Sequence, residues 1–482
     1  MMATPEFLDA ASKLLGPRGF TRDPELVDPW LTDWRGRYTG KALGLASPAS
    51  TAEVAALVRL CAKQGVPIVP QGGNSGMCGG ATPDESGEAV LLSLRRMNTV
   101  RRLDTQVREV ICEAGVILQT LHEAAAAEGL RFPLTLGGKG SATIGGLIST
   151  NAGGTQVLRH GSMRAQVLGI EAVLADGSVF DALTPLKKDN RGFDLKQLLI
   201  GSEGTLGIVT AATLRLLPAL ADRAVLWIGI GAVGDAPKLL AHAQEIAGDA
   251  LEGFELMPRH SLEAVLAHVP GSRNPLAGDH AWHVLIELAA DRTHAERLPS
   301  LAQTLLESAF DKGLVEDATI AANEAQAEAF WLLRDEIAPA ERALGPAMQH
   351  DISVPVASMA AFIEKTGPEV EARFPGTRVV AFGHLGDGNV HYHVLAPKGA
   401  QPGEWEMNGG KQISHFVHDL VTRWHGSISA EHGIGQLKRD ELERLGDPVQ
   451  LHLMQAVKQA LDPQGLLNPG KLVPLAPPSG NP

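Results

Sequence analysis

Apolar residues follow two different periods in the first 220 residues, and their alternation predicts a domain built from both helices and strands. From Ser50 to Gly65 the apolar side chains recur every three or four residues, which is the spacing of one helix face. Ser50 and Glu53 form a capping box at the start of this predicted helix, and Gly65 is a stop signal at its end. A second helix is predicted over residues 117–128. Short apolar runs predict strands at residues 66–69, 89–94, 107–113, 167–174, 178–180 and 208–216, with a hairpin signal at Asp176-Gly177.

The pattern changes between Leu217 and Asp222, where we place a domain boundary. After it, helical spacing of Ala, Leu and Glu dominates at residues 236–246, 295–310 and 324–344, with a strand-like run at residues 282–288. A chain of 482 residues is too long for one ordinary hydrophobic core, so two or three domains are expected.

The charge balance narrows the range of partners. Lys and Arg number 42 against 55 Asp and Glu, which gives a formal net charge of −13. This excess of negative charge argues against nucleic acid or an anionic membrane as the main partner. Because no run of about 18 uninterrupted apolar residues occurs, no membrane span is predicted.

Cysteine usage and the N-terminus bear on the cellular compartment. The three cysteines, Cys61, Cys78 and Cys112, have no metal-type spacing and are too few for a disulfide framework. Glu6 and Asp9 interrupt the first fifteen residues, so neither a signal peptide nor a transit peptide is expected there. We therefore expect a reducing, cytoplasmic location.

Three glycine-rich clusters separate the predicted elements of the first domain, at residues 70–76, 137–154 and 201–207. Successive backbone N–H groups without side chains can cradle an anion such as a pyrophosphate. None of the clusters has the G-x-G-x-x-G spacing between a strand and a helix, and none is a P-loop with its Lys-Ser/Thr. One such cluster alone is more often a turn than a ligand site, but three in one domain favour a ligand site.

Two histidine-bearing segments carry the strongest chemical signal: Gly-His-Leu-Gly-Asp-Gly-Asn-Val-His at residues 383–391 and Ala-Glu-His-Gly-Ile-Gly at residues 430–435. His384, His391 and Glu431 can hold a divalent cation and leave one coordination position open, as a catalytic site requires. His432, beside the carboxylate, can act as a base. The alternative is a glycine-rich turn with incidental histidines, since the chain has 17 of them.

Six motifs in a fixed order produce a resemblance to a known family. They are Pro-Gln-Gly-Gly-Asn-Ser-Gly, Ile-Gly-Gly-Leu-Ile-Ser-Thr-Asn-Ala-Gly-Gly, Leu-Ile-Gly-Ser-Glu-Gly-Thr-Leu-Gly-Ile-Val-Thr, the two histidine segments and Leu-Asn-Pro-Gly-Lys. Over residues 45–472 the chain resembles the FAD-linked oxidases of the vanillyl-alcohol-oxidase type. Within them it is most similar to the D-2-hydroxy acid dehydrogenases, which act on D-2-hydroxyglutarate, D-lactate or glycolate.

The resemblance implies an α+β fold in which successive parts of the chain form domains with different functions. Residues 1–220 would form the FAD-binding domain, and residues 221–447 an α+β substrate cap domain that carries the metal site. Residues 448–482 would form a C-terminal segment that returns to the FAD domain.

The resemblance also implies one FAD, bound without a covalent bond. Some relatives attach the flavin through a histidine, and His160 stands in a loop where such a bond would be sought. The residues implied to line the cofactor belong to the glycine clusters and the tail: Pro70, Gln71, Gly72, Gly73, Asn74, Ser75, Gly76, Gly138, Ser141, Thr143, Gly145, Gly146, Ser149, Asn151, Gly153, Gly154, Glu203, Gly204, Gly207, Ile208 and Asn468.

The chemistry implied by the resemblance is oxidation of a D-2-hydroxy acid, of the D-2-hydroxyglutarate or D-lactate type, to the 2-oxo acid, with the hydride going to FAD. His384, His391 and Glu431 would hold one divalent metal, for which zinc suits the ligand set better than manganese. His432 would take the hydroxyl proton. Arg334 matches a family arginine that binds the substrate carboxylate; without the resemblance it reads as a helix-surface arginine.

Three positions depart from the pattern of the D-2-hydroxyglutarate enzymes. Gln349 stands where they usually have a lysine, Ala338 where they have a threonine, and His393 where they have an asparagine. The loss of a cationic and a hydroxyl contact weakens the case for a second carboxylate on the substrate. His393 could replace the lost contact or be a further metal ligand, and the sequence leaves both open.

Other classes of function were compared with the dehydrogenase. Alkylglycerone-phosphate synthases share the fold and use FAD in a transferase reaction, but they carry a histidine run in place of Ala430-Glu431-His432. A non-enzymatic flavoprotein, or a hydrolase that uses only the metal, fits the combined flavin and metal motifs less well. For the dehydrogenase, the sequence does not choose among an electron-transfer flavoprotein, a quinone and a cytochrome as electron acceptor. A homodimer is expected because it is common among the relatives.

Overall fold

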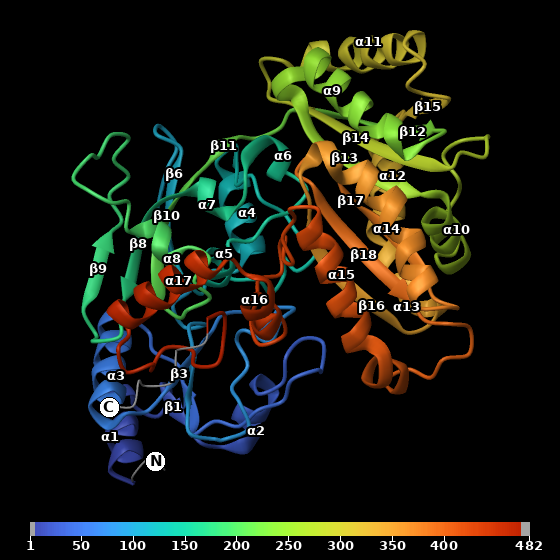
Figure 1. Cartoon of the computed structure of the whole chain (residues 1–482). Coiled ribbons are helices and arrows are strands. Elements are labelled where there is room, and N and C mark those ends of the chain that lie inside the picture. Colours follow the sequence, from blue (N-terminus) through green and yellow to red (C-terminus); the bar gives the residue numbers. More distant parts are fainter. Residues whose placement is uncertain (1–4, 474–482) are drawn as a thin grey trace. The chain divides into compact units, whose positions relative to one another are not determined.

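The computed structural model describes residues 5–473, and these residues form two compact units (Figure 1). The first unit contains the described residues up to Gly154, then His160–Pro218, and finally those from His432 onward. The second unit contains Thr155–Arg159 and Ala219–Glu431. The chain leaves the first unit for the long run after Pro218, within the interval where the sequence pattern changes.

A four-stranded sheet opens the first unit, in the order β1-β2-β4-β3. The helices α1 (Pro5–Leu15) and α3 (Thr51–Gln64) pack their apolar faces on it. The predicted capping box of α3 is present: Ser50 Oγ accepts a hydrogen bond from the backbone N–H of Glu53 at 3.2 Å, and Gly65 has a φ of 66°. The strands of this sheet are β1 (Phe20–Thr21), β2 (Gly44–Ala46), β3 (Ile68–Gln71) and β4 (Val90–Ser93).

A five-stranded antiparallel sheet follows, in the order β5-β6-β10-β8-β9. The hairpin predicted at Asp176-Gly177 joins β8 to β9, with Gly177 at a φ of 77°. The helices α4 (Leu118–Ala127) and α5 (Ile144–Thr150) pack on this sheet, so the second glycine cluster is attached to its core. The strands are β5 (Val100–Asp104), β6 (Glu109–Glu113), β8 (Val167–Val173), β9 (Val179–Ala182) and β10 (Ile208–Arg215).

Short elements connect these sheets. They are α2 (Pro24–Val27), α6 (Val157–His160), α7 (Met163–Gln166), α8 (Lys196–Leu199), α16 (Arg439–Leu445), and the paired strands β7 (Leu130–Arg131) and β11 (Leu217–Pro218).

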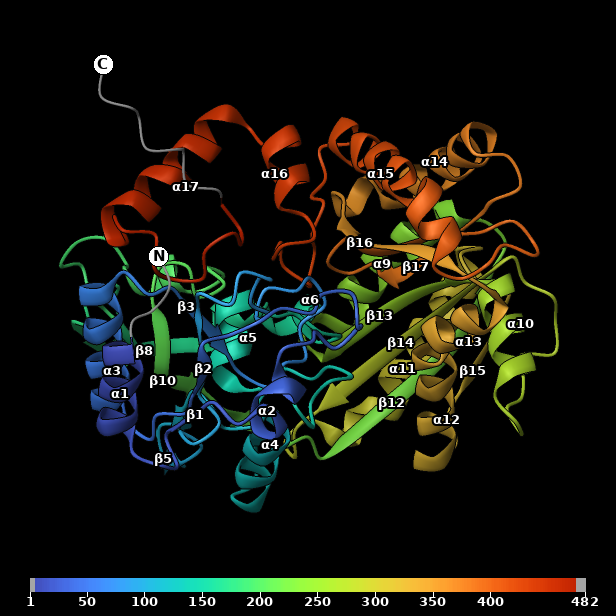
Figure 2. The ribbon, with the colours of Figure 1, turned by 90° about the horizontal axis from the view of Figure 1, so that it is seen from below.

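A seven-stranded antiparallel sheet forms the centre of the second unit, in the order β15-β12-β14-β13-β17-β18-β16. Apolar residues on both faces are buried by helices; Figure 2 shows α14 and α15 on one side of the sheet and α12 and α13 on the other. The strands are β12 (Asp222–Ile230), β13 (Leu251–Pro258), β14 (Trp282–Ala290), β15 (Asp317–Ile320), β16 (Ala347–Ser353), β17 (Arg378–His384) and β18 (Asn389–Leu395).

Two sets of helices cover this sheet. One face carries α9 (Ala236–Ala247), α11 (Leu298–Asp311), α14 (Met359–Arg373) and α15 (Lys411–Arg423), and the other carries α10 (Arg259–His268), α12 (Glu324–Asp335) and α13 (Ile337–Leu344). The helical pattern predicted over residues 324–344 forms two helices, α12 and α13, which are separated at Glu336, a break that the pattern did not indicate. Pro339 explains the interruption, since a proline ring clashes with the carbonyl of the residue four positions earlier and has no N–H to bond it.

The C-terminal tail returns to the first sheet through α17 (Pro448–Leu461). Leu467 lies parallel to Ile68 of β3, with backbone hydrogen bonds of 2.8 Å on both sides of the bridge. The buried Lys458 ammonium binds Asp462 at 2.6 Å and the carbonyls of Thr205 and Leu467 at 2.7 and 2.9 Å. One buried cation thus joins the tail to the third glycine cluster.

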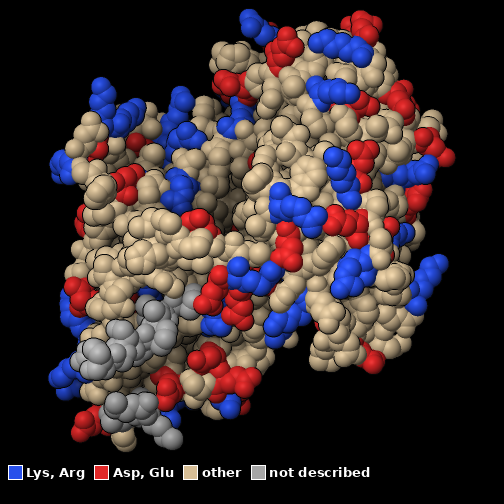
Figure 3. Space-filling view, in the orientation of Figure 1, with Lys and Arg blue, Asp and Glu red and all other residues tan. Residues whose placement is uncertain are grey.

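Acidic and basic side chains are interspersed on the face in Figure 3, and no large patch of one sign covers it. None of the helices within residues 5–473 combines the length and the apolar character that crossing a bilayer requires.

We expect Asp462→Ala to lower the free energy of unfolding by about 3–5 kcal/mol, because it leaves the buried Lys458 charge without its counter-ion. Urea unfolding of the purified protein measures the loss. The control is Asp194→Ala, which removes an exposed partner of Lys196 and should cost about 0.5 kcal/mol or less. Equal losses in the two variants would contradict this account of the tail.

Candidate functional site

The glycine clusters of the first unit lie against one another. A Cβ added at Gly72 would lie 2.2 Å from Thr143 Oγ1, and one at Gly73 would lie 1.7 Å from the Ser141 carbonyl oxygen. A Cβ at Gly204 would lie 2.5 Å from the ring of Pro70. Glycine is required here because three segments far apart in the sequence leave no room for a Cβ: Gly73 lies against backbone, and Gly72 and Gly204 lie against side chains.

The loop at residues 72–76 has the properties of an anion cradle. None of its five backbone N–H groups donates a hydrogen bond to any residue in the described part of the chain. The loop follows β3 and is partly exposed, so these donors face solvent or a ligand. A run of free backbone donors on a fixed loop suits the pyrophosphate of a dinucleotide such as FAD.

Several residues that the sequence assigned to the cofactor have other contacts. Glu203 is buried, and its carboxylate accepts hydrogen bonds from the backbone N–H groups of Ile434 at 2.7 Å and Gly435 at 2.8 Å. Asn151 Oδ1 accepts from Ser162 and Arg164, both at 2.9 Å. These side chains hold the chain in place. Ile208 is fully packed in the core, and Gly145, Gly154 and Gly207 allow close packing against Ala114, Thr135 and Leu199.

Asn468 connects the tail to the glycine clusters. Its side-chain Nδ2 donates to the carbonyls of Gly80 at 2.9 Å and Glu203 at 2.7 Å, and its backbone N–H donates to Ile68. The prediction that this residue returns to the cofactor segments is compatible with these contacts. It has a φ of 45°, a left-handed conformation that asparagine tolerates better than most residues.

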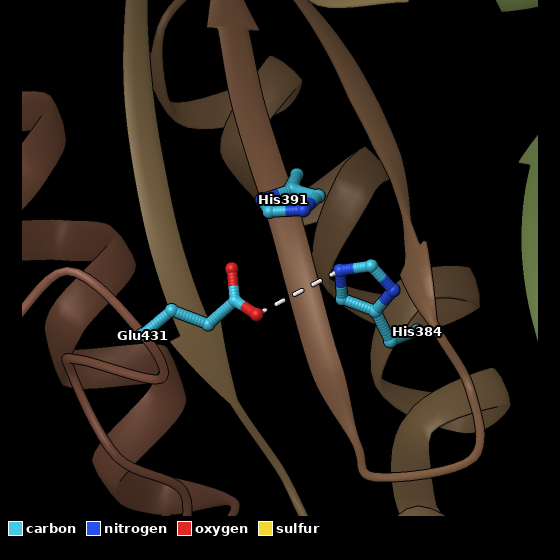
Figure 4. A group of neighbouring side chains, drawn as sticks. All are labelled: His384, His391 and Glu431. Carbon is cyan, nitrogen blue, oxygen red and sulfur yellow. Dashed lines mark ion pairs between the residues drawn. The ribbon is translucent and has the colours of Figure 1, made fainter. Parts of the chain in front are cut away.

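The two histidine segments meet at one end of the large sheet in the second unit. His384 ends β17, His391 lies in β18, and Glu431 follows α15 in a loop (Figure 4). One ligand atom from each residue lies within 4.8 Å of the other two. His384 Nε2 is 3.9 Å from Glu431 Oε1, and the two imidazole centroids are 5.4 Å apart. The structure thus brings together the three residues that the sequence nominated for a metal.

The Glu431 carboxylate has the properties of a cation ligand. Its Oε1 is buried and has no hydrogen-bond partner among residues 5–473, although a buried carboxylate oxygen is normally satisfied. Burial raises the pKa of Glu431 to about 7, and the nearby Asp351 and Asp387 carboxylates add to the rise. Asp351 also accepts the backbone N–H of Glu431 at 2.9 Å. A cation at Oε1 would satisfy the oxygen and lower this pKa.

Glu255 is a site residue that the sequence did not reveal. It lies in the middle of β13, is 1% exposed, and uses both carboxylate oxygens: Oε1 contacts His384 Nδ1 at 2.6 Å and Oε2 accepts from Arg334 Nε at 2.9 Å. Burial alone would raise the pKa of Glu255, but the charges of Arg334 and His384 hold it at about 2. The only signal in the sequence is a pair of glutamates, Glu252 and Glu255, within a mostly apolar run at residues 251–258.

The two histidines have opposite charge preferences. Although burial opposes a charge, Glu255 raises the pKa of His384 to about 9. Burial, together with the positive charges of His384 and Arg334, holds the pKa of His391 well below its usual range. His391 is therefore neutral at pH 7, as a metal ligand must be.

Arg334 is not a helix-surface arginine. It lies on α12 with a side chain that is 13% exposed, and its Nη2 is 3.2 Å from His384 Nε2. His393 is not among the residues whose ligand atoms gather in this cluster. Its Nδ1 contacts the buried Glu341 carboxylate at 2.5 Å, and Ser261 donates to the same carboxylate at 3.2 Å.

The raised pKa of His384 gives a testable pH dependence. The folded protein holds a proton that the unfolded chain releases, so this stabilisation is complete below pH 6.5 and is lost as the pH rises to about 9. In the presence of a chelator, the stability difference between the unmodified protein and His384→Asn should shrink by up to about 3 kcal/mol over that range. Urea unfolding at both pH values measures it, with the exposed His452→Asn as control. A difference that is constant with pH would contradict the assignment.

Comparison with known proteins agrees with this architecture. Residues 42–182 match the FAD binding domain family, and residues 221–472 match the family described as FAD linked oxidases, C-terminal domain. The chain is 38% identical over 465 residues to a probable mitochondrial D-2-hydroxyglutarate dehydrogenase of Oryza sativa subsp. indica, covering 96% of this chain and 80% of the relative. It is 37% identical over 450 residues to a D-2-hydroxyglutarate dehydrogenase of Xanthomonas citri pv. viticola, covering 93% of each chain.

A solved structure shows the same fold at low identity. The crystal structure of p-cresol methylhydroxylase with substrate bound superposes with a TM-score of 0.73 at 16% identity, covering 97% of this chain and 96% of that one. The expected α+β architecture, an FAD-binding domain with an α+β cap, is confirmed. The chain belongs to the FAD-linked oxidases of the vanillyl-alcohol-oxidase fold, in the family that contains the D-2-hydroxy acid dehydrogenases.

Proposed function

We propose that this protein oxidises a D-2-hydroxy acid to the 2-oxo acid with one non-covalent FAD and one divalent metal, zinc suiting the ligands better than manganese. The observation that carries the proposal is the cluster of His384, His391 and Glu431 beside the buried Arg334, in the cap unit of an FAD-linked oxidase. The names of the relatives support the general reaction.

The residues of the cluster offer a cation two imidazoles and one carboxylate, and His384 would release one proton on binding it. His391 is neutral, His384 directs Nδ1 to Glu255 and Nε2 toward Glu431, and Glu431 offers an unpartnered oxygen. A bound cation would act as a Lewis acid toward the hydroxyl and carboxylate oxygens of the substrate. FAD would supply the hydride acceptor.

Two further side chains would bind the substrate and accept its proton. Arg334 would bind the substrate carboxylate with the guanidinium edge that Glu255 does not use, since Glu255 accepts only from Nε. His432 directly follows Glu431 and would take the hydroxyl proton, because an imidazole titrates near neutral pH. Removing that proton makes the alkoxide from which the hydride departs.

Anaerobic titration with D- and L-2-hydroxy acids tests the proposed function directly. We expect D-2-hydroxy acids, and not their L-enantiomers, to bleach the visible absorbance of the flavin. Acid precipitation should release one FAD per chain into the supernatant. Flavin that no 2-hydroxy acid reduces would refute the reaction, and flavin that stays with the precipitated polypeptide would refute the non-covalent binding.

We expect His432→Ala to slow flavin reduction by about 100-fold or more, the usual scale for losing a general base. Substrate affinity should be largely retained, because Arg334 and the three metal-ligating side chains are unchanged. Stopped-flow reduction at several substrate concentrations separates the two effects. His452→Ala, which removes an exposed histidine of α17, should reduce at the normal rate. A reduction rate in His432→Ala within a few-fold of normal would remove it as the base.

The residues beyond the metal cluster favour a substrate with one carboxylate. His393 and Gln349 lie opposite each other on β18 and β16, two pairs further along than His391 and Asp351. Two residues of a strand cover about 7 Å, the reach of a short dicarboxylate. His393 is occupied by Glu341. Ala338 has no polar side-chain atom, so none of these side chains offers an uncommitted cation to a second carboxylate.

We therefore expect D-lactate, or a longer D-2-hydroxy monocarboxylate, to be oxidised at least comparably to D-2-hydroxyglutarate. Gln349→Lys should raise kcat/KM for D-2-hydroxyglutarate relative to D-lactate by about tenfold, the value of one charged hydrogen bond. Steady-state rates with both acids measure the ratio, and Gln303→Lys on the exposed surface of α11 is the control. A strict requirement for the second carboxylate in the unmodified protein would contradict this interpretation.

The second half of the reaction needs a separate oxidant for the reduced flavin. We propose an electron-transfer flavoprotein, a quinone or a cytochrome in this role, and a homodimeric, cytoplasmic enzyme. The support for a reducing compartment is that Cys61, Cys78 and Cys112 are all buried and none of the three forms a disulfide.

A further inference from the structure

Glu255 contacts two residues of the candidate site, His384 and Arg334. It lies on β13, a strand that carries no other residue of the site. Its two oxygens are divided between His384 and Arg334, at 2.6 and 2.9 Å. These partners lie 129 and 79 residues away in the sequence, so only the folded sheet brings them together. The pairing of Glu255 with His384 in the register of β13 and β17 fixes the distance between them.

The contact with Glu255 determines which nitrogen of His384 is available. Because an ionised carboxylate can only accept a hydrogen bond, the contact keeps a proton on Nδ1, so Nε2 is the nitrogen that can release its proton and bind a metal. Nε2 is also the nitrogen that faces Glu431, at 3.9 Å. Metal-ligating histidines commonly donate their other N–H to a carboxylate, which fixes the tautomer and the ring orientation.

The contact with Arg334 restricts the guanidinium in the same way. Glu255 accepts from Nε, which places the planar group with Nη2 next to His384. An arginine that was free to rotate would lose conformational entropy on binding a carboxylate, and this one is already ordered. One buried carboxylate therefore orders a candidate metal ligand and a candidate substrate ligand together.

We propose that Glu255 is the positioning residue of this site: it holds His384 as an Nε2 metal ligand and Arg334 as the carboxylate-binding group, and so couples metal affinity to substrate affinity. This inference rests on the proposed metal-dependent function. It assigns to Glu255 no contact with the substrate or the flavin.

The test compares Glu255→Gln with Glu255→Asp in the FAD-loaded protein. The glutamine amide can turn its N–H toward Nδ1 of His384, which favours the tautomer that protonates Nε2 and blocks the metal. After treatment with a chelator, zinc affinity is measured by competition with a chromophoric chelator. We expect Glu255→Gln to bind zinc 10- to 100-fold more weakly, the usual range for losing such a partner. Glu255→Asp keeps the charge and should bind zinc more tightly than Glu255→Gln, though less tightly than the unmodified protein.

The coupling has a second measurement, made at saturating zinc. There Glu255→Gln should retain an elevated KM for the 2-hydroxy acid, about tenfold above normal, because Arg334 is no longer ordered. Its kcat should fall by a smaller factor. A KM that returns to normal once zinc is saturating would overturn the coupling to Arg334.

Glu287 provides a matched control. It lies on the neighbouring strand β14, is 8% exposed, and also accepts from two donors, Arg223 at 3.3 Å and Trp331 at 2.6 Å. Neither donor belongs to the histidine cluster, so Glu287→Gln should keep normal zinc affinity even if it lowers stability. Zinc binding by Glu255→Gln at normal affinity, or equal losses in both variants, would overturn the proposal.

The outcomes separate this inference from the function on which it rests. If the unmodified protein binds no divalent metal, the proposed metal site and this inference both fail. If it binds zinc and Glu255→Gln binds zinc equally well, only this inference fails. If Glu255→Gln does not fold, Glu255→Asp decides the question, since normal zinc affinity and normal KM in that variant would overturn the proposal.

Discussion

A charge that is removed from water must lie beside a group of opposite charge. The second unit meets this requirement at the candidate site. Glu255 and His384 are buried, Arg334 is mostly buried, and each of the three is stabilised by another member of the trio. Without the two cations, the carboxylate in the centre of β13 would cost several kcal/mol of desolvation. His384 and Arg334 belong to the candidate site. The contacts that stabilise these buried charges are therefore the same contacts that position the site.

The first unit meets a different constraint, which is the close approach of backbones. Gly72, Gly73 and Gly204 allow three segments to touch where any Cβ would collide with a neighbour. The same packing leaves the N–H groups at residues 72–76 without partners inside the described chain. Backbone donors on a rigid loop bind an anion without the entropy loss of ordering long side chains. The first unit thus offers a ligand fixed backbone dipoles, whereas the second unit offers a ligand side chains that are held by paired charges.

Local signals in the sequence predicted the elements that depend on local chemistry. The capping box at Ser50, the hairpin at Asp176-Gly177 and the two histidine segments were all found from neighbouring residues. Glu255 was not found, because its partners are 79 and 129 residues away and nothing in the neighbouring sequence distinguishes it from Glu252 in the same strand. The break at Glu336 was missed because the apolar period continues across Pro339. The features that the sequence did not predict depend on charge pairs and strand register between distant residues, and only the folded structure shows these.

The division of the chain has an evolutionary consequence. Apart from five residues at Thr155–Arg159, the second unit is one uninterrupted run from Ala219 to Glu431, inserted into a first unit that resumes at His432. A gene segment encoding such an insert can be replaced in a single recombination event while both flanking parts of the flavin half stay in frame. New substrate ranges can therefore arise by exchanging this segment, and the candidate metal ligands and the glutamate proposed to position them would be inherited together.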